Sequence, residues 1–161
     1  MAKAADYGLG PNTFPRGWFI VAESSELDEG PMAVRFFGRD LALYRGESGK
    51  PVMLDAYCAH MGTHLTASTS AMIVKNGLQI EGDSIRCPYH GWRYNSAGDV
   101  DDIPYFDGPC PKSASIRSYP VVDNMGCVMA WFDPDGRAPD YDPPFLPQWD
   151  DPQWVNWKLD H

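Results

Sequence analysis

The sequence is poor in positive charge. Its 161 residues include 13 Lys and Arg against 22 Asp and Glu, and the formal net charge is −9. A protein that binds duplex nucleic acid needs a basic face to neutralise phosphates, so this balance argues against that class of partner.

Long apolar runs are also missing. The longest clearly apolar stretch is WFIVA at residues 18–22, whereas a membrane-spanning helix needs about 20 such residues. The first residues, MAKAADYG, contain no hydrophobic signal region, so we expect a cytoplasmic protein that is neither exported nor inserted in a membrane. Four cysteines in such a chain indicate reduced thiols or metal ligands rather than a disulfide framework.

Turn-forming residues are plentiful, with 15 Gly and 15 Pro, and they favour a turn-rich β protein over a helix bundle. Tight turns are expected at residues 38–40 and 123–124, and a short helix is the most that residues 66–76 would hold. The spacing of the β-prone segments is typical of a sandwich or barrel, so we expect an all-β fold. These segments lie at residues 18–21, 33–37, 41–44, 52–54, 119–122 and 126–132.

The last part of the chain has its own composition. Residues 133–152 contain six prolines and many aspartates, which favours an extended linker or a covering arm. Residues 153–159 then alternate apolar and polar side chains like the start of a strand. We therefore divide the chain into a domain over residues 1–132 and a proline-rich linker over 133–161 that leads toward a missing part; a tail folded back onto the body is the alternative.

Two short segments each pair one cysteine with one histidine. Cys58 and His60 form a C-x-H pattern, and Cys87 and His90 form a C-x-x-H pattern. Two thiolates and two imidazoles are a donor set for tetrahedral zinc, although a C-x-H pair is a poor bite on a single ion. The alternative is a pair of sulfide-bridged irons, with two cysteines on one iron and two histidines on the other.

The second arrangement requires each loop to supply one ligand of each type, and both loops do so. Gly62 and Gly91 each follow the pattern's histidine closely and permit tight backbone turns around a cluster.

With these loops, the sequence resembles Rieske [2Fe–2S] domains, specifically the N-terminal domain of ring-hydroxylating and steroid-type Rieske oxygenases. The resemblance implies a small domain of antiparallel sheets, a sandwich or barrel, in which the two Cys/His loops, residues 57–65 and 86–94, form a cluster-binding subdomain. The motifs that carry it span residues 14–132 in the family's order: FPRGW at 14–18, GRDL at 38–41, DAYCAHMG at 55–62, CPYHGWRY at 87–94, IPY at 103–105 and YPV at 119–121.

The resemblance also implies the ligand set of a Rieske-type [2Fe–2S] cluster. Cys58 and Cys87 would hold the buried iron, and His60 and His90 would hold the outer iron, where electrons leave. Residues 66–80 depart from the family pattern and are interpreted as an insertion beside the cluster.

High-potential respiratory Rieske proteins carry an extra cysteine in each loop and a serine near the second. The corresponding positions here are Thr63, Tyr89 and Trp92. With fewer hydrogen bonds to the sulfurs, we expect a potential on the order of −150 mV, at the low end of the Rieske range.

Other candidates receive plainer interpretations. His64 is expected to be a loop residue, Cys127 a small buried hydrophobe, and Cys110 part of a turn-rich loop. Trp92 and Tyr94 are expected to be core aromatics beside the cluster rather than electron relays.

A Rieske oxygenase activates O₂ at a separate mononuclear iron held by two histidines and a carboxylate. Only His64 and His161 remain after the cluster ligands, so we expect this chain to have no catalytic residue and to carry one electron. As an oxidoreductase component, it would take electrons from a reductase or ferredoxin and pass them to a catalytic domain, in cis or in a neighbouring subunit. The full protein would oxidise an apolar aromatic or steroid ring. The alternatives are a stand-alone Rieske-type ferredoxin and a zinc-stabilised binding module.

Overall fold

The computed structural model describes residues 14–68 and 70–155. Within this part of the chain, eleven strands dominate: β1 (Gly17–Glu23), β2 (Met32–Phe36), β3 (Arg39–Arg45), β4 (Pro51–Asp55), β5 (Ile80–Glu81), β6 (Ser84–Arg86), β7 (Arg93–Tyr94), β8 (Val100–Asp102), β9 (Ser118–Tyr119), β10 (Val121–Asn124) and β11 (Cys127–Phe132). The helical segments are short: η2 (Ser24–Glu29), α1 (Met72–Lys75), η3 (Lys112–Ala114) and η4 (Pro147–Asp150). The predicted all-β fold is confirmed, and α1 is the short helix expected within 66–76. No described helix has the length and apolar character to cross a membrane.

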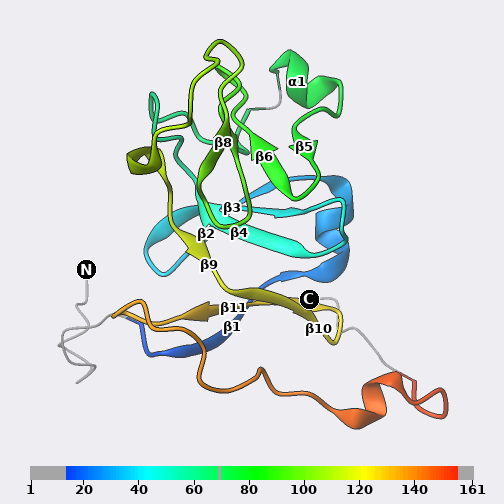
Figure 1. Ribbon diagram of the computed structural model, residues 1–161. Helices are drawn as coiled ribbons and strands as arrows, with labels where there is room; N and C mark the ends of the chain where they lie inside the picture. Colours follow the sequence, from blue (N-terminus) through cyan, green and yellow to red (C-terminus); the bar gives the residue numbers. More distant parts are fainter. Residues whose placement is uncertain (1–13, 69, 156–161) are drawn as a thin grey trace, which may run out of the picture.

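The strands form three antiparallel sheets, with the orders β1-β11-β10, β2-β3-β4-β9 and β5-β6-β7-β8. Figure 1 shows the β2-β3-β4-β9 sheet between the other two. We call these the outer sheet (β1, β10, β11), the central sheet (β2, β3, β4, β9) and the cluster-loop sheet (β5–β8).

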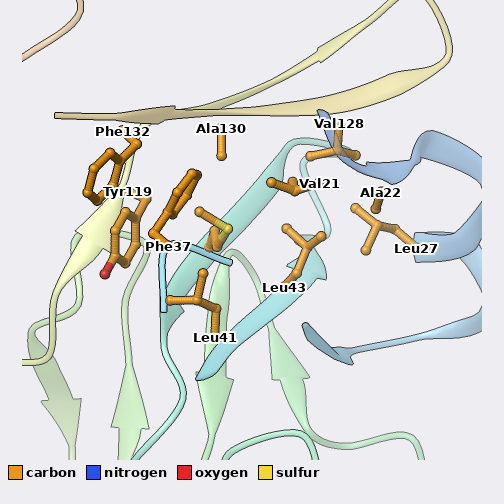
Figure 2. Close-up of a cluster of buried hydrophobic side chains, with 11 residues drawn as sticks. Val21, Ala22, Leu27, Phe37, Leu41, Leu43, Tyr119, Val128, Ala130 and Phe132 are labelled. Carbon is orange, nitrogen blue, oxygen red and sulfur yellow. The ribbon is translucent and has the colours of Figure 1, made fainter. Parts of the chain in front are cut away.

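The central sheet is buried on both faces because alternate side chains of β3 enter different cores. Leu41 and Leu43 join the first core, between the central and outer sheets, and Figure 2 shows them opposite Val128 and Phe132 of β11. Ala42 and Tyr44 join the second core, between the central and cluster-loop sheets. The second core comprises Ala42, Tyr44, Val52, Leu54, Cys58, Leu65, Ile85, Cys87, Tyr94, Val100 and Ile103.

Both predicted turns are displaced by one or two residues. The first lies earlier in the chain than predicted, and the second lies later. The turn placed at 38–40 is formed by Phe37 and Gly38, whose φ angles are 55° and 70°, and residues 39–40 already belong to β3. Phe37 adopts this turn conformation with its ring stacked on Phe132, at a centroid distance of 4.5 Å. Two successive positive φ angles are typical of the two-residue turn that matches strand twist.

The same correction applies to the turn predicted at residues 123–124. These residues belong to β10, and Met125 and Gly126, with φ of 53° and 76°, make the turn instead. The expected strand at 119–122 is also divided at Pro120. Tyr119 pairs with Met53 of the central sheet, whereas Val121 pairs with Ala130 of the outer sheet, so the chain changes sheets at the proline.

The proline-rich segment follows the outer sheet (Figure 1). Trp18 Nε1 donates a hydrogen bond to the carbonyl oxygen of Tyr141 at 2.8 Å, and the Tyr141 ring packs edge-on against Trp131. Asn124 Nδ2 donates to the carbonyl oxygen of Pro144 at 2.8 Å. This segment is therefore a covering arm over its described length. The strand predicted at residues 153–159 is not formed over residues 153–155. Its remaining residues lie outside the described part of the chain.

Candidate metal centre

The two Cys/His loops share one backbone pattern. The Cys58 N–H donates to the carbonyl of Thr63 at 2.9 Å, and the Cys87 N–H donates to the carbonyl of Trp92 at 2.7 Å. In each loop, the N–H of the glycine four residues after the cysteine donates back to the cysteine carbonyl. The distance is 2.9 Å for Gly62 and 3.1 Å for Gly91. The loops therefore have the same closure, although their histidines stand at different positions.

A left-handed glycine makes each closure possible. Gly62 has φ of 70° and Gly91 has φ of 79°, a region that side chains with a Cβ rarely adopt. The sequence expectation that these glycines permit tight turns is consistent with this geometry.

Different elements hold the two loops. The first leaves the end of β4 and is closed by pairing of Tyr57 with His64 and by the bond from Leu65 N–H to the carbonyl of Ala56 at 2.8 Å. The second is the connection between β6 and β7, where Arg86 pairs with Arg93. Both loops therefore start from strands that line the second core.

The two thiols lie at the inner side of the loops. Cys58 is 3% exposed and Cys87 is 2% exposed. Their mutual hydrogen bond is the main cause that lowers the pKa of Cys58 and raises the pKa of Cys87, so the pair shares one proton. Burial opposes ionisation of both thiols, while the backbone N–H groups of His60 and Met61 favour the Cys58 thiolate. An anionic sulfur is the form that binds a metal.

The two imidazoles lie nearer the surface and face each other. The ring centroids of His60 and His90 are 4.8 Å apart, and both residues are partly exposed. His60 stacks on Trp92 with an interplanar angle of 3° and a centroid distance of 4.7 Å. Within the described residues, the His60 Nδ1 atom is buried without a hydrogen-bond partner. A buried, unpaired ring nitrogen is costly unless it binds a metal, so this atom fits a ligand.

The sequence matches the Rieske [2Fe-2S] domain family over residues 17–120. The chain belongs to this family. Its Rieske domain carries a Rieske-type [2Fe–2S] cluster and transfers electrons through it, as in oxygenase-type proteins.

Curated relatives of the Rieske domain include enzymes whose names refer to cholesterol or to a 3-ketosteroid. It is 39% identical to cholesterol 7-desaturase nvd of Bombyx mori, over 84% of this chain and 29% of that protein. It is 34% identical to a probable 3-ketosteroid-9-alpha-monooxygenase oxygenase component of Rhodococcus rhodochrous, over 96% of this chain and 37% of that protein. The chain thus spans only about a third of the length of these relatives.

Two solved structures show the same fold. Dicamba monooxygenase is 30% identical, with a TM-score of 0.65 over 80% of this chain and 38% of that one. NdmB of Pseudomonas putida CBB5 is 29% identical, with a TM-score of 0.66 over 84% of this chain and 39% of that one.

Tyr94 of the Rieske domain has a polar contact that sequence reasoning missed. Its ring is buried as expected, but its hydroxyl lies 3.2 Å from Cys58 Sγ and accepts a hydrogen bond from the Ala59 N–H at 2.9 Å. Since the backbone donates to the oxygen, the hydroxyl proton is free to point at the sulfur. Burial is the main cause that raises the pKa of Tyr94, which keeps this proton in place. The sequence offers no signal for the contact, because it depends on how β7 crosses the first loop.

The remaining histidine and cysteines considered from the sequence, His64, Cys110 and Cys127, lie outside the two ligand pairs. His64 Nδ1 accepts a hydrogen bond from the Thr66 N–H at 3.3 Å, and its ring packs edge-on against Tyr57. Cys110 packs at the margin of the second core. Cys127, expected to be a small buried hydrophobe, is only partly buried because it begins β11 beside the hairpin turn.

Residues 66–80, interpreted from the sequence as an insertion, are attached to the first loop near their C-terminal end. Gln79 is 5% exposed, and its Nε2 atom donates to the carbonyl oxygen of Leu65. Sequence reasoning missed this contact, which fastens the C-terminal end of residues 66–80 to the last residue of the first loop.

Among the described residues, no three His, Cys, Asp or Glu side chains are grouped as ligands of one metal ion. The four predicted ligands instead form a buried thiol pair and an outer imidazole pair. Two donors of each kind are what the two irons of a Rieske cluster take.

Proposed function

We propose that Cys58, Cys87, His60 and His90 are the cluster ligands and that this chain is the Rieske domain of a steroid-type oxygenase. The observation that carries the ligand assignment is the pairing of buried thiols and outer imidazoles on two loops with one closure pattern. The unpaired, buried Nδ1 of His60 supports the outer pair.

When bound, the cluster takes up and releases one electron. The two cysteines would hold the inner iron away from water, and the histidines would hold the outer iron near the surface. The Tyr94 hydroxyl would donate to Cys58 Sγ and so stabilise the more negative, reduced state. His60 and His90 would provide the route by which an electron leaves the domain, since they are the ligands closest to solvent.

The substrate and partners of the whole protein are also part of this proposal. Relatives named cholesterol 7-desaturase and 3-ketosteroid-9-alpha-monooxygenase support a steroid or other apolar ring as the substrate. Electrons would come from a reductase or ferredoxin and go to a mononuclear iron in a catalytic domain, in cis or in a neighbouring subunit. We divide the chain at residues 132–133 and propose that the covering arm continues toward that domain. A cytoplasmic location is supported by the four cysteines, none of which forms a disulfide within the described residues.

Purification under anaerobic conditions tests the ligand assignment. The chain should contain two irons and two sulfides, be EPR-silent when oxidised, and give a rhombic signal after reduction with dithionite. Each of Cys58→Ser, Cys87→Ser, His60→Gln and His90→Gln should abolish this signal, whereas His64→Gln should retain it. A colourless protein with one zinc would refute the proposal.

A stand-alone Rieske-type ferredoxin is a second candidate, and one observation favours it. The covering arm packs back onto the outer sheet through Trp18 and Asn124, as the tail of a self-contained carrier would. Reading the gene beyond His161 separates the two. A downstream motif of two histidines and one carboxylate would support the oxygenase, and a stop codon with no linked oxygenase gene would support the carrier.

A further inference from the structure

Arg86 makes contacts with three separate segments around the second Cys/His loop. Its Nε and Nη2 atoms donate to the two carboxylate oxygens of Glu81 on β5, at 2.8 and 2.9 Å. Its Nη1 atom donates to Asp102 on β8 and to the carbonyl oxygen of Gly91 in the loop, each at 2.7 Å. The side chain is only 13% exposed, so these bonds are formed largely out of water.

Gly91 directly follows His90, and both of its backbone polar groups are held. Its N–H donates to the Cys87 carbonyl, and its own carbonyl accepts from Arg86. A Cβ at this position would stand 2.9 Å from Pro104 Cγ. The backbone immediately after His90 is therefore fixed by one backbone bond, one guanidinium and one packed proline ring.

The first loop is held differently at the corresponding place. The residue before Cys58 is Tyr57, which is 50% exposed and donates its hydroxyl proton to Asp40, away from the loop. A Cβ at Gly62 would meet nothing within 4 Å. The guanidinium contact at Gly91 is thus a feature of the second loop, and it acts on the side of the site that carries His90.

Only arginine suits this position. Its planar fork places two N–H groups on one carboxylate while a third donor remains for the loop carbonyl. A lysine ammonium carries the same charge but lacks the fork, so it would lose the bidentate bond or the bond to Gly91.

We propose that Arg86 is a positioning residue for His90. Anchored by Glu81 and Asp102, its guanidinium fixes the Gly91 carbonyl and thereby the orientation in which His90 is presented to the outer iron. This inference rests on the proposed assignment of His90 as a ligand.

Arg93 supplies a matched control. It is the direct cross-strand partner of Arg86, and it pairs with the same carboxylate, Glu81, and with Asp101. None of the described contacts of its guanidinium reaches His90 or Gly91. Arg93→Gln therefore removes a positive charge from the same ion-pair network without removing the bond to Gly91.

The test compares the holoprotein with Arg86→Gln, Arg86→Lys and Arg93→Gln. It measures the EPR spectrum of the reduced cluster, the midpoint potential and the rate of iron release to a chelator. Loss of a group that orients a metal ligand typically costs about 10–100-fold in metal affinity. We therefore expect Arg86→Gln to release iron at least tenfold faster and to show a shifted or broadened EPR spectrum. Arg86→Lys should keep a potential near wild type but still release iron faster. Arg93→Gln should match wild type in spectrum and iron release.

Two outcomes separate the possible failures. A wild-type protein without the rhombic signal would refute the ligand assignment itself. A normal wild-type signal, with Arg86→Gln indistinguishable from Arg93→Gln in spectrum and iron release, would refute the positioning role alone. If the Arg86 variants do not fold, Asp102→Asn removes one anchor of Arg86 and should accelerate iron release in the same direction; an unchanged rate in that variant would overturn the proposal.

Discussion

Replacement of Tyr94 by phenylalanine removes one hydroxyl and nothing else from the thiol side of the site. The hydroxyl lies 3.2 Å from Cys58 Sγ and is also the acceptor for the Ala59 N–H. Because a donor to a cluster sulfur favours the more negative, reduced state, its loss should lower the midpoint potential.

The size of the shift follows from the strength of such a bond. A hydrogen bond to a charged group is worth about 1.5–3 kcal/mol, and only the difference between the two redox states affects the potential. If that difference is roughly 1 kcal/mol, the one-electron potential falls by about 40 mV, since a tenfold change in equilibrium corresponds to about 59 mV. The Ala59 N–H also loses its acceptor, but Ala59 is exposed and water can replace the bond, so the free energy of unfolding should fall by no more than about 0.5–1.5 kcal/mol.

Protein-film voltammetry on wild type and Tyr94→Phe measures this shift. The raised pKa of Tyr94, caused mainly by burial, means that the hydroxyl stays protonated through neutral pH, so the difference should not vary between about pH 6 and pH 9. Tyr44→Phe is the control, because Tyr44 is equally buried in the second core but donates to the backbone carbonyl of Asp83 at 2.9 Å. A midpoint in Tyr94→Phe that is unchanged or higher, or an equal fall in Tyr44→Phe, would show that the hydroxyl does not act on the sulfur.

Three further measurements test other parts of the structure. Wild-type protein should titrate with a midpoint on the order of −150 mV, and a strongly positive value would contradict the expected scarcity of hydrogen bonds to the sulfurs. Hydrogen bonding by Arg86 is the main cause that lowers the pKa of Glu81 from 4.5 to about 2. The stability that the ionised Glu81 contributes is therefore present above about pH 4.5 and is lost as the pH falls toward 2. Melting temperatures measured over this interval should fall less steeply in Glu81→Gln than in wild type, and parallel curves would count against this ion pair as a source of stability. Gly91→Ala should destabilise the fold by more than Gly62→Ala. Both substitutions place alanine at a positive φ, which costs about 1–2 kcal/mol, but only at position 91 would the new Cβ lie 2.9 Å from a proline atom. Equal losses of stability in chemical denaturation would argue against this steric contact.

Sequence reasoning predicted the features that depend on local pattern. The apolar runs at residues 18–21, 41–44 and 52–54 became strands because β-branched and large apolar side chains recur between turn residues. The Cys/His spacing sufficed to identify the family, since few other folds need one thiol and one imidazole from each of two loops.

Features that depend on long-range packing were missed. The strands β5 to β8 are two or three residues long, too short to show a periodic pattern, and cross-strand pairing defines them. Phe37 occupies a turn although it is aromatic, because its ring is needed in the first core. The Tyr94 hydroxyl and the Arg86 guanidinium acquire their roles only when β7 and β8 are brought beside the loops.

The alternation of β3 between two cores couples the cluster to the far side of the molecule. Sliding β3 by one residue would exchange Leu41 and Leu43 with Ala42 and Tyr44, and would spoil both interiors at once. The outer sheet is therefore needed by the part of the molecule that holds the cluster loops. Its removal would expose one face of β3 and β4, and the first loop leaves the end of β4. Iron retention should consequently respond to damage at Val128 or Phe132, although neither residue belongs to the core that contains the thiols.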